Sequence, residues 1–308
     1  MRLLVALGGN ALLHRHERPE EATQAARLAQ AAPALVRLAA RHEVVFVHGN
    51  GPQVGLLARE STDDQSLREP YPLEALVAET QGLIGSLLVQ ALHAAGLAGP
   101  LVALVTHTVV DVEGAAAAAP TKFIGAVYER SRADRLAAEH GWRMARDGDG
   151  WRRVVSSPNP LRIVELAPAK TLVDAGTTVV MAGGGGIPIS GHGVGRPVEA
   201  VIDKDRTAAM LAEALGADLL AILTDVPGVM TDFGTPRAAI IASTTQAQLR
   251  EHPFPAGSMG PKVDAACDFV DRTGRRAAIG SLEQAEALVD GTMGTQITSA
   301  TGRAAPAR

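Results

Sequence analysis

The sequence predicts an α/β fold in which a parallel β-sheet lies between layers of helices. Short, almost continuous apolar runs alternate along the chain with longer segments of helical periodicity. Continuous apolar runs are typical of strands that are covered on both faces, because neither face can then be polar. The repeated strand–helix–strand order indicates right-handed crossovers between parallel strands, which place helices on both sides of the sheet.

The composition supports a full-sized core and excludes several classes of protein. Of the 308 residues, 46% are hydrophobic and 20% charged, which excludes general disorder. The single cysteine, Cys267, excludes a disulfide framework and a cysteine zinc site. A net charge of −4 argues against nucleic acid or an anionic membrane surface as the main partner.

No signal peptide and no membrane span are expected. The apolar start of the chain ends after seven residues, and no uninterrupted apolar stretch of ~18 residues occurs. The sequence therefore predicts a soluble, cytoplasmic protein.

The apolar runs predict the strands and the periodic segments predict the helices. Strands are expected at residues 3–7, 44–48, 101–106, 178–182, 219–224 and 277–280. Helices are expected at residues 20–41, 72–95, 167–175, 206–215, 263–272 and 282–289. Ser281 and Gln284 are spaced as a capping box for the last helix.

The alternation breaks once, over residues 111–160. An alanine tract, a charged stretch and the turn sequence Asp-Gly-Asp-Gly at 147–150 predict a compact excursion that contains a hairpin and acts as a lid or arm. Both tryptophans, Trp142 and Trp151, fall in it, so intrinsic fluorescence should report its movement. Residues 299–308 are expected to be a flexible tail.

Three of the predicted strands run directly into glycine clusters. The residues are Gly8, Gly9 and Asn10; Gly49, Asn50 and Gly51; and Gly184 and Gly185 within 183–186. The carboxyl ends of parallel strands form one edge of a sheet, and glycines there let backbone N–H groups approach an anion. A single loop of this kind could be only a tight turn, but three together predict an anion cradle. No P-loop and no Gly-x-Gly-x-x-Gly motif occurs, so neither a P-loop enzyme nor a dinucleotide-binding protein is predicted.

Lysine is rare in this chain: four of the 29 basic residues are lysine. Lys204 stands between Asp203 and Asp205, which could be no more than helix caps or could hold its ammonium group ready for a phosphate oxygen. Lys262 follows Gly-Ser-Met-Gly-Pro at a helix start, where the helix dipole favours an anion. Lys122 lies in the excursion and could swing over the site, whereas Lys170 lies in an ordinary helical stretch.

Three ammonium groups together with glycine amides suit the transfer of a phosphoryl group. Such a reaction depends on positioning and on neutralising charge, with little covalent participation by the protein. Mg²⁺ would bridge the nucleotide phosphates, held mostly by phosphate and water, and no residues are predicted as its ligands. His14 and His16 are typical of a solvated loop, and Cys267 of core packing.

The motifs, taken in order, closely resemble those of the carbamate kinases, a branch of the amino acid kinase family. They span residues 3–297 and include Gly8-Gly-Asn-Ala-Leu12, His48–Gly55, Thr80-Gln-Gly82, Pro120-Thr-Lys122, Gly183–Pro188, Glu199–Asp205, Leu223-Thr-Asp225, Gly257–Lys262 and Gly291–Thr295. The Asp-Lys-Asp and Gly-Ser-Met-x-Pro-Lys elements are far more specific than a glycine loop.

The resemblance implies a three-layer αβα sandwich with an eight-stranded, mainly parallel sheet and a small protruding subdomain. It implies a single domain over residues 1–308, with an N-terminal lobe at about 1–196 for carbamoyl phosphate and a protruding arm at about 112–158. The C-terminal lobe, at about 197–298, would take the nucleotide, and the molecule would be a homodimer. The implied reaction, which belongs to arginine metabolism, is reversible and Mg²⁺-dependent: carbamoyl phosphate and ADP give ATP and carbamate.

The resemblance also implies roles for single residues. Lys122, Lys204 and Lys262 would contact the transferring phosphoryl group, and Asp205 would orient the lysines. The glycine-loop residues named above would bind the carbamoyl and phosphoryl groups. The nucleotide side would be formed by Asp203, Leu223, Thr224, Asp225, Val229 and Met259.

Two residues depart from the family pattern, and two alternatives stay open. Phe123 follows Lys122 where proline is usual, and Thr235 stands where the nucleotide loop usually has lysine. One alternative is a kinase of the same fold with another carboxylate or phosphate acceptor. The other is a catalytically silent nucleotide-binding homologue, against which the three retained motif lysines argue.

Overall fold

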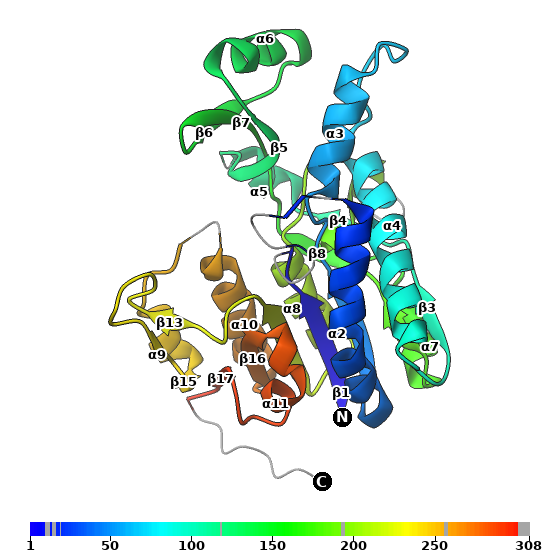
Figure 1. Ribbon diagram of the computed structural model, residues 1–308, viewed down its shortest axis with the longest axis vertical. Coiled ribbons are helices and arrows are strands. Elements are labelled where there is room, and N and C mark those ends of the chain that lie inside the picture. Colours follow the sequence, from blue (N-terminus) through cyan, green and yellow to red (C-terminus); the bar gives the residue numbers. More distant parts are fainter. Residues whose placement is uncertain are drawn as a thin grey trace.

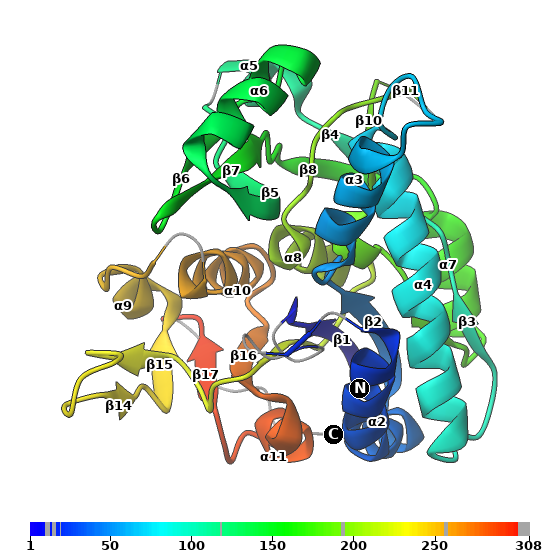
Figure 2. The ribbon, with the colours of Figure 1, turned by 45° about the horizontal axis from the view of Figure 1, so that its top comes forward.

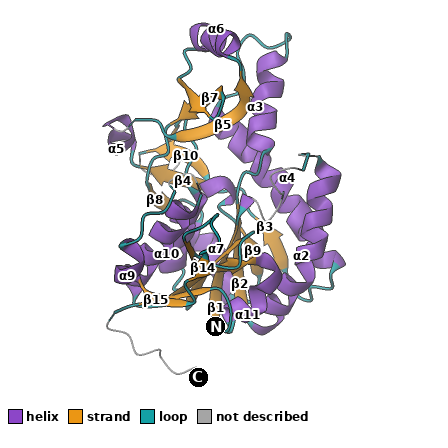
Figure 3. Ribbon diagram, turned by 60° about the vertical axis from the view of Figure 1, so that its left-hand side comes forward, coloured by secondary structure: helices purple, strands orange, loops and turns teal. Residues whose placement is uncertain are grey.

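The computed structural model describes residues 1–9, 13, 17–18, 20–117, 119–191, 195–255 and 258–300. Its centre is an eight-stranded sheet in the order β15-β17-β16-β12-β1-β2-β9-β3, enclosed by helices (Figures 1 and 3). These strands are β1 (Arg2–Leu7), β2 (Glu43–His48), β3 (Leu101–Ala103), β9 (Thr178–Val180), β12 (Leu219–Thr224), β15 (Ser243–Thr245), β16 (Arg276–Ser281) and β17 (Thr295–Thr298). Every pairing between neighbours is parallel except that of β16 with β17. The predicted αβα sandwich is confirmed.

Helices cover both faces of the sheet because successive strand residues point to opposite sides. In β1, Leu4 and Ala6 join one core cluster, while Leu3, Val5 and Leu7 join the other. The first cluster is closed by α7 (Leu166–Asp174), α8 (Lys204–Ala214) and α10 (Met259–Thr273). The second is closed by α2 (Glu21–Arg41), α4 (Leu73–Ala94) and α11 (Ala285–Val289). Both faces of a strand are therefore buried, which explains the continuous apolar runs.

Helix α4 is long and apolar enough to cross a membrane by length and composition, but it serves as a core helix here. Half of its most apolar window is buried inside the protein. Its buried polar residues Thr80 and Gln81 are hydrogen-bonded to other parts of the fold, as buried polar groups in a core helix must be.

A small arm rises from the body, as the sequence predicts (Figure 1, top). It carries its own three-stranded sheet in the order β5-β7-β6, together with α6 (Arg130–His140). Its strands are β5 (Lys122–Tyr128), β6 (Met144–Asp147) and β7 (Gly150–Val155). Asp147 pairs with Gly150 across the tight turn between β6 and β7, which confirms the predicted hairpin.

Smaller elements connect the sheet to the arm and complete the C-terminal half. The first group is β4 (His107–Val110), α5 (Val112–Ala117), β8 (Pro160–Ile163), η1 (Gly183–Gly185), β10 (Ile187–Ser190) and β11 (Arg196–Pro197). The second is β13 (Met230–Thr231), β14 (Ala239–Ile240), α9 (Gln246–Arg250) and η2 (Leu282–Gln284). Strands β11, β10, β4 and β8 form a second sheet.

Two expectations about local structure were wrong. The strand expected at 101–106 ends at Ala103, because the backbone N–H of Thr106 donates to Gln81 Oε1 at 2.9 Å instead of to the ladder. Ser281 does cap the following turn through the N–H of Glu283, but the Oε1 atom of Gln284 makes no hydrogen bond, so the predicted capping box does not form.

Four helices of the described residues were missed by the sequence reasoning: the short helices α5 and α9, and the longer helices α3 and α6. Helix α3 (Gln53–Asp63) follows Pro52 directly and buries Val54 and Ala58, one helical turn apart. Helix α6 occupies the charged stretch of the arm and buries only Ala133 and Leu136. Neither has a long apolar stripe, which is why periodicity did not reveal them.

Candidate active site

The three glycine loops meet at one edge of the sheet, as expected from their positions after parallel strands. Strands β1, β2 and β9 are neighbours, with Leu7 opposite His48 and Phe46 opposite Val180. The segments that follow them therefore leave the sheet side by side. The backbone N–H of Gly8 donates to the carbonyl of Leu223 at 2.8 Å, which ties the first loop to the end of β12.

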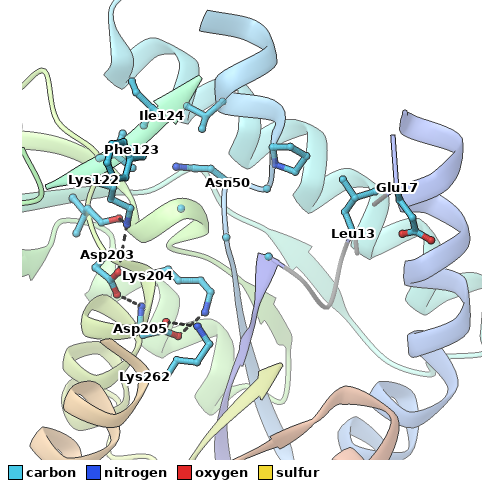
Figure 4. A pocket seen from close by; sticks show the side chains of 18 residues that line it. Leu13, Glu17, Asn50, Lys122, Phe123, Ile124, Asp203, Lys204, Asp205 and Lys262 are labelled. Carbon is cyan, nitrogen blue, oxygen red and sulfur yellow. Dashed lines mark hydrogen bonds and ion pairs between the residues drawn. The ribbon is translucent and has the colours of Figure 1, made fainter. Parts of the chain in front are cut away.

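A cavity of about 520 Å³ opens at this edge, beneath the root of the arm (Figure 4). Its lining residues come from the glycine loops, the arm, and the segment that leads into α8. They are Gly9, Leu13, Glu17, Gly49, Asn50, Gly51, Pro52, Val54, Lys122, Phe123, Ile124, Gly184, Val201, Ile202, Asp203, Lys204, Asp205 and Lys262.

The three motif lysines converge on this cavity from three separate elements. Lys204 begins α8 and Lys262 lies in the first turn of α10, whereas Lys122 begins β5 in the arm. Figure 4 shows Lys204 and Lys262 pointing toward one another, with Lys122 reaching down from the arm. All three line the same cavity, although they are 58 to 140 positions apart in the chain.

Asp205 joins two of these lysines. Its Oδ1 accepts a hydrogen bond from Lys204 Nζ at 2.5 Å, and its Oδ2 accepts from Lys262 Nζ at 3.2 Å. The Asp205 side chain is only 4% exposed, so little water screens either contact. The carboxylate thus keeps two like charges side by side.

Asp203 performs two tasks, of which the sequence reasoning had weighed one. Its Oδ1 caps α8 by accepting from the N–H groups of Asp205 and Arg206, at 2.9 and 3.3 Å. Its Oδ2 lies 3.4 Å from Lys122 Nζ, which also donates to the carbonyl of Ile202 at 3.0 Å. The expected clamp of Lys204 between two carboxylates is therefore wrong: Asp205 holds Lys204, and Asp203 holds Lys122.

The environment lowers the pKa values of both Lys204 and Asp203, which disfavours the charged form of the lysine and favours that of the aspartate. Burial lowers the pKa of Lys204, and the nearby Lys262 lowers it further against the opposing effect of Asp205. Burial acts to raise the pKa of Asp203, but Lys122, Lys204 and two backbone N–H groups outweigh it and hold that pKa below its ordinary value. Asp203 is thus held as a carboxylate, while Lys204 carries a positive charge at a cost in desolvation, which a bound anion would relieve.

A buried layer of polar groups fixes the loops behind the cavity. The Nδ1 of His48 lies 2.8 Å from the carbonyl of Gly49, and burial lowers the pKa of His48 to about 4. The hydroxyl of Thr80 donates to Asn50 Oδ1 at 2.8 Å. Gly184 is packed so tightly that a Cβ there would lie 1.7 Å from the same Asn50 oxygen. Asn50 is therefore held in place from two sides.

The remaining predicted residues divide into three groups. Gly8 and Gly185 lie just behind the lining, the latter with its carbonyl bound by Thr108 and Thr207. The side chains of Leu223 and Val229 are fully buried in the core, and Thr224, Asp225 and Met259 are not among the lining residues. Asn10, Gly257, His14, His16 and the tail residues 301–308 lie outside the described part of the chain.

Several lining residues were missed by the sequence reasoning. Leu13 and Glu17 lie across the cavity from the lysines (Figure 4), and Val201 and Ile202, which precede Asp203 in the chain, also line the cavity. The apolar pair Val201-Ile202 directly precedes the charged motif, and this proximity in sequence was the available signal. Leu13 and Glu17 carried no such signal, because only the path of the chain brings them near.

The described residues include no group of three or more histidine, cysteine, aspartate or glutamate side chains that could hold a metal ion. The carboxylates of Asp203 and Asp205 already accept hydrogen bonds from lysines.

The arrangement is a polar pocket in which the ammonium groups of three lysines, with the carboxylates of Glu17, Asp203 and Asp205 in the same lining, offer donors to a small anion. Ammonium groups approach it from three directions, and the glycine loops after β1, β2 and β9 contribute backbone amides at the same edge. Fixed donors around a group that bears developing charge are what phosphoryl transfer requires.

Comparisons with known proteins agree with this chemistry. Residues 1–281 match the family model described as the amino acid kinase family. The chain is 48% identical over 304 residues to a carbamate kinase of Rhizobium meliloti, which covers 97% of this chain and 94% of the relative. It is 44% identical over 296 residues to a carbamate kinase of Escherichia coli strain K12, and this match covers 96% of this chain and 99% of the relative.

A solved structure shows the same likeness in three dimensions. The carbamate kinase of Giardia lamblia bound to AMP-PNP superposes with a TM-score of 0.86 at 36% sequence identity. The match covers 97% of this chain and 98% of that one.

Proposed function

This chain belongs to the amino acid kinase family, and we propose from that membership that it is a carbamate kinase. The enzyme transfers the phosphoryl group of carbamoyl phosphate to ADP, giving ATP and carbamate, and the reaction is reversible. Carbamate then decomposes to ammonia and bicarbonate. Relatives at 44–48% identity over nearly the full length support this activity.

One observation carries the proposal: Lys122, Lys204 and Lys262 line a single cavity with the three glycine loops. In the reaction the bond between the carbamoyl oxygen and phosphorus breaks, and carbamate leaves with the electron pair. A β-phosphate oxygen of ADP forms the new bond to phosphorus. The three ammonium groups neutralise charge on the transferring group, and the loop amides hold it in line.

Asp205 prepares the site before substrate arrives. It keeps Lys204 and Lys262 close together and restricts their rotamers, so less reorganisation is needed when phosphate oxygens replace it as acceptors. Mg²⁺ enters as part of the nucleotide substrate, where it screens the charge between ADP and the phosphoryl group. The catalytic set in this proposal is Lys122, Lys204, Asp205 and Lys262.

The proposal also divides the chain between the two substrates. Carbamoyl phosphate would bind on the side of residues 1–196, at Gly8–Asn10, Gly49–Gly51, Gly184 and Gly185. The nucleotide would lie on the side of residues 197–298, near Asp203, Met259 and the turn after β12 that contains Leu223, Thr224, Asp225 and Val229. We expect a cytoplasmic homodimer, which light scattering of the purified protein would test as a mass twice 31.9 kDa.

An assay of ATP formation tests the activity. Protein, Mg-ADP and carbamoyl phosphate should give ATP, detected with luciferase, and acetylglutamyl phosphate should give little or none. ATP from acetylglutamyl phosphate alone would identify a kinase of the same fold with another acceptor. ATP from neither, with ADP still bound in calorimetry, would identify a silent nucleotide-binding homologue.

A further inference from the structure

A half-buried ion pair links the arm to the segment that leads into α8. Arg153 lies on β7, and its guanidinium stacks on the ring of Trp142 with its central carbon 4.2 Å from the ring centroid. Its Nη2 donates to Glu199 Oε1 at 2.5 Å. The Arg153 side chain is only 10% exposed although its partner is 57% exposed. A guanidinium held between an aromatic face and one carboxylate makes a directional contact rather than a loose surface pair.

Glu199 belongs to the segment that leads directly to the reactive lysines. Further along this segment, the N–H of Val201 donates to the carbonyl of Ser156 at 3.1 Å, and the carbonyl of Ile202 accepts from Lys122 Nζ at 3.0 Å. Residues 199–203 are therefore bound along the arm at three points. The ion pair lies at the Glu199 end of this row of three contacts, and Lys122 lies at the Ile202 end.

A displacement at one end of this row of contacts would reach the other end, because the strands of the arm are paired with each other. Lys122 lies opposite Val155, and Ile124 lies opposite Arg153, in the antiparallel ladder of β5 and β7. The Ile124 side chain is buried together with those of Val155 and Val201, which packs the arm against the same segment. A shift of Glu199 relative to Arg153 would therefore move Lys122 relative to Asp203 and Lys204.

We propose that the Arg153–Glu199 ion pair positions Lys122 for phosphoryl transfer by fixing the arm against residues 199–203. This inference rests on the proposed carbamate kinase activity and adds two positioning residues to it. Neither residue lines the cavity, so each acts through Lys122. A catalytic cation must be held to within about 0.5 Å of its productive place. The ion pair adds a fixed point to the contacts of Lys122 with Ile202 and Asp203 and to the packing of Ile124.

The first test is a kinetic comparison of Glu199→Ala with a matched control. Glu199→Ala should lower kcat/KM for carbamoyl phosphate by about 10- to 100-fold, the range expected when a reacting group is misplaced. Glu199→Gln, which keeps one hydrogen bond, should lose less. The control is Glu286→Ala, which removes another ion pair, between Glu286 Oε1 and Arg37 Nε at 2.6 Å. Neither of these two residues lines the cavity. Its activity should stay within twofold of wild type.

A double-mutant cycle separates positioning from general damage to the fold. In a Lys122→Ala background, Glu199→Ala should cost less than threefold, because the group that it positions is already gone. An unchanged loss in that background overturns the inference, and so does activity of Glu199→Ala within twofold of wild type. Thermal unfolding of all variants identifies any loss that comes from instability.

A measurement without turnover keeps this inference distinct from the proposed activity. Trp142 and Trp151 both lie in the arm, so their fluorescence anisotropy decay reports its motion. Glu199→Ala should add a fast component that Glu286→Ala lacks. Identical decays in the two variants would overturn the inference that the Arg153–Glu199 ion pair holds the arm. If the wild type makes no ATP from carbamoyl phosphate, the activity proposal fails, while this measurement still decides whether the ion pair holds the arm.

Discussion

The ammonium nitrogen of Lys262 lies 3.2 Å from Asp205 Oδ2, although 57 positions separate the two residues. The other oxygen of the same carboxylate accepts a hydrogen bond from Lys204. One aspartate thus serves as counter-ion to two cations that would otherwise repel each other. In the proposed reaction, the remaining N–H donors of the same ammonium groups would bind oxygens of the phosphoryl group.

Removal of either clustered lysine should abolish most of the activity. Lys204→Ala and Lys262→Ala should each lower kcat by ~10²–10⁵, the range for loss of one transition-state cation. The control is Lys170→Ala, because Lys170 pairs with Asp174 on the exposed surface of α7 and does not line the cavity. Steady-state ATP formation measures the effect, and a change below tenfold in both site variants would favour a silent nucleotide-binding protein.

Asp205→Asn should damage both activity and stability. The two ammonium groups would keep their repulsion and lose their buried counter-ion, a change that costs about 3–5 kcal/mol when one partner of a buried pair is removed. Asp174→Asn removes an exposed carboxylate that pairs with Lys170 and Arg2 and should destabilise the protein much less, because solvent screens both pairs. Urea denaturation compares the two variants, and equal losses would mean that Asp205 is no more than a surface charge.

Lys122→Ala should reduce activity while leaving the fold intact. Lys122 is half-buried at the start of β5 and contacts only Ile202 and Asp203 through its ammonium group, so few packing contacts depend on it. Activity and the midpoint of thermal unfolding should therefore separate in this variant. If the midpoint falls by as much as in Asp205→Asn, Lys122 has a structural role instead.

Acid should destabilise the protein through His48. Burial lowers its pKa from 6.5 to about 4, so the unfolded state binds more protons than the folded state between these values. Stability is then fully present above pH 6.5 and is lost as the pH falls toward 4, by about 3 kcal/mol for this group. Burial also lowers the pKa of His42, which adds a slope of the same sign.

Denaturation curves at several pH values check this effect. His48→Asn should flatten the dependence of the unfolding free energy on pH between 6.5 and 4. His93→Asn, a change at an exposed position of α4, should leave it as in the wild type. A slope in His48→Asn as steep as that of the wild type would contradict the assignment of the effect to this residue.

Gly184→Ala should impair the acyl phosphate side of the cavity. Gly184 has φ +65°, and an added Cβ would lie 1.7 Å from Asn50 Oδ1, which Thr80 holds in place. Gly96→Ala is the matched control, because Gly96 has φ +89° but open space around it. Both variants should lose about 1–3 kcal/mol through backbone strain. Only Gly184→Ala should also raise the KM for carbamoyl phosphate.

Much of the fold could be predicted because its strands are buried on both faces. The apolar run of β12 matches residues 219–224 residue for residue, and β1, β2 and β16 differ from their predicted bounds by a residue or less at each end. The limits of β3 could not be predicted, since Gln81 from a distant helix ends that strand. Helices α3 and α6 lacked the apolar stripe on which periodicity depends.

The sequence by itself determined most strands of the sheet and the glycine loops that follow them, and it pointed to three lysines in a chain that has almost none elsewhere. Local patterns specify such elements, because an apolar run or a glycine cluster lies within one short stretch of the chain. Only the tertiary structure decided how these groups pair. Asp205 rather than Asp203 holds Lys204, and Arg153 meets Glu199 across the root of the arm. The contacts of Asp203 with Lys122, of Asp205 with Lys262 and of Arg153 with Glu199 join residues from separate elements. Their partners follow from how the elements pack, which no local pattern encodes.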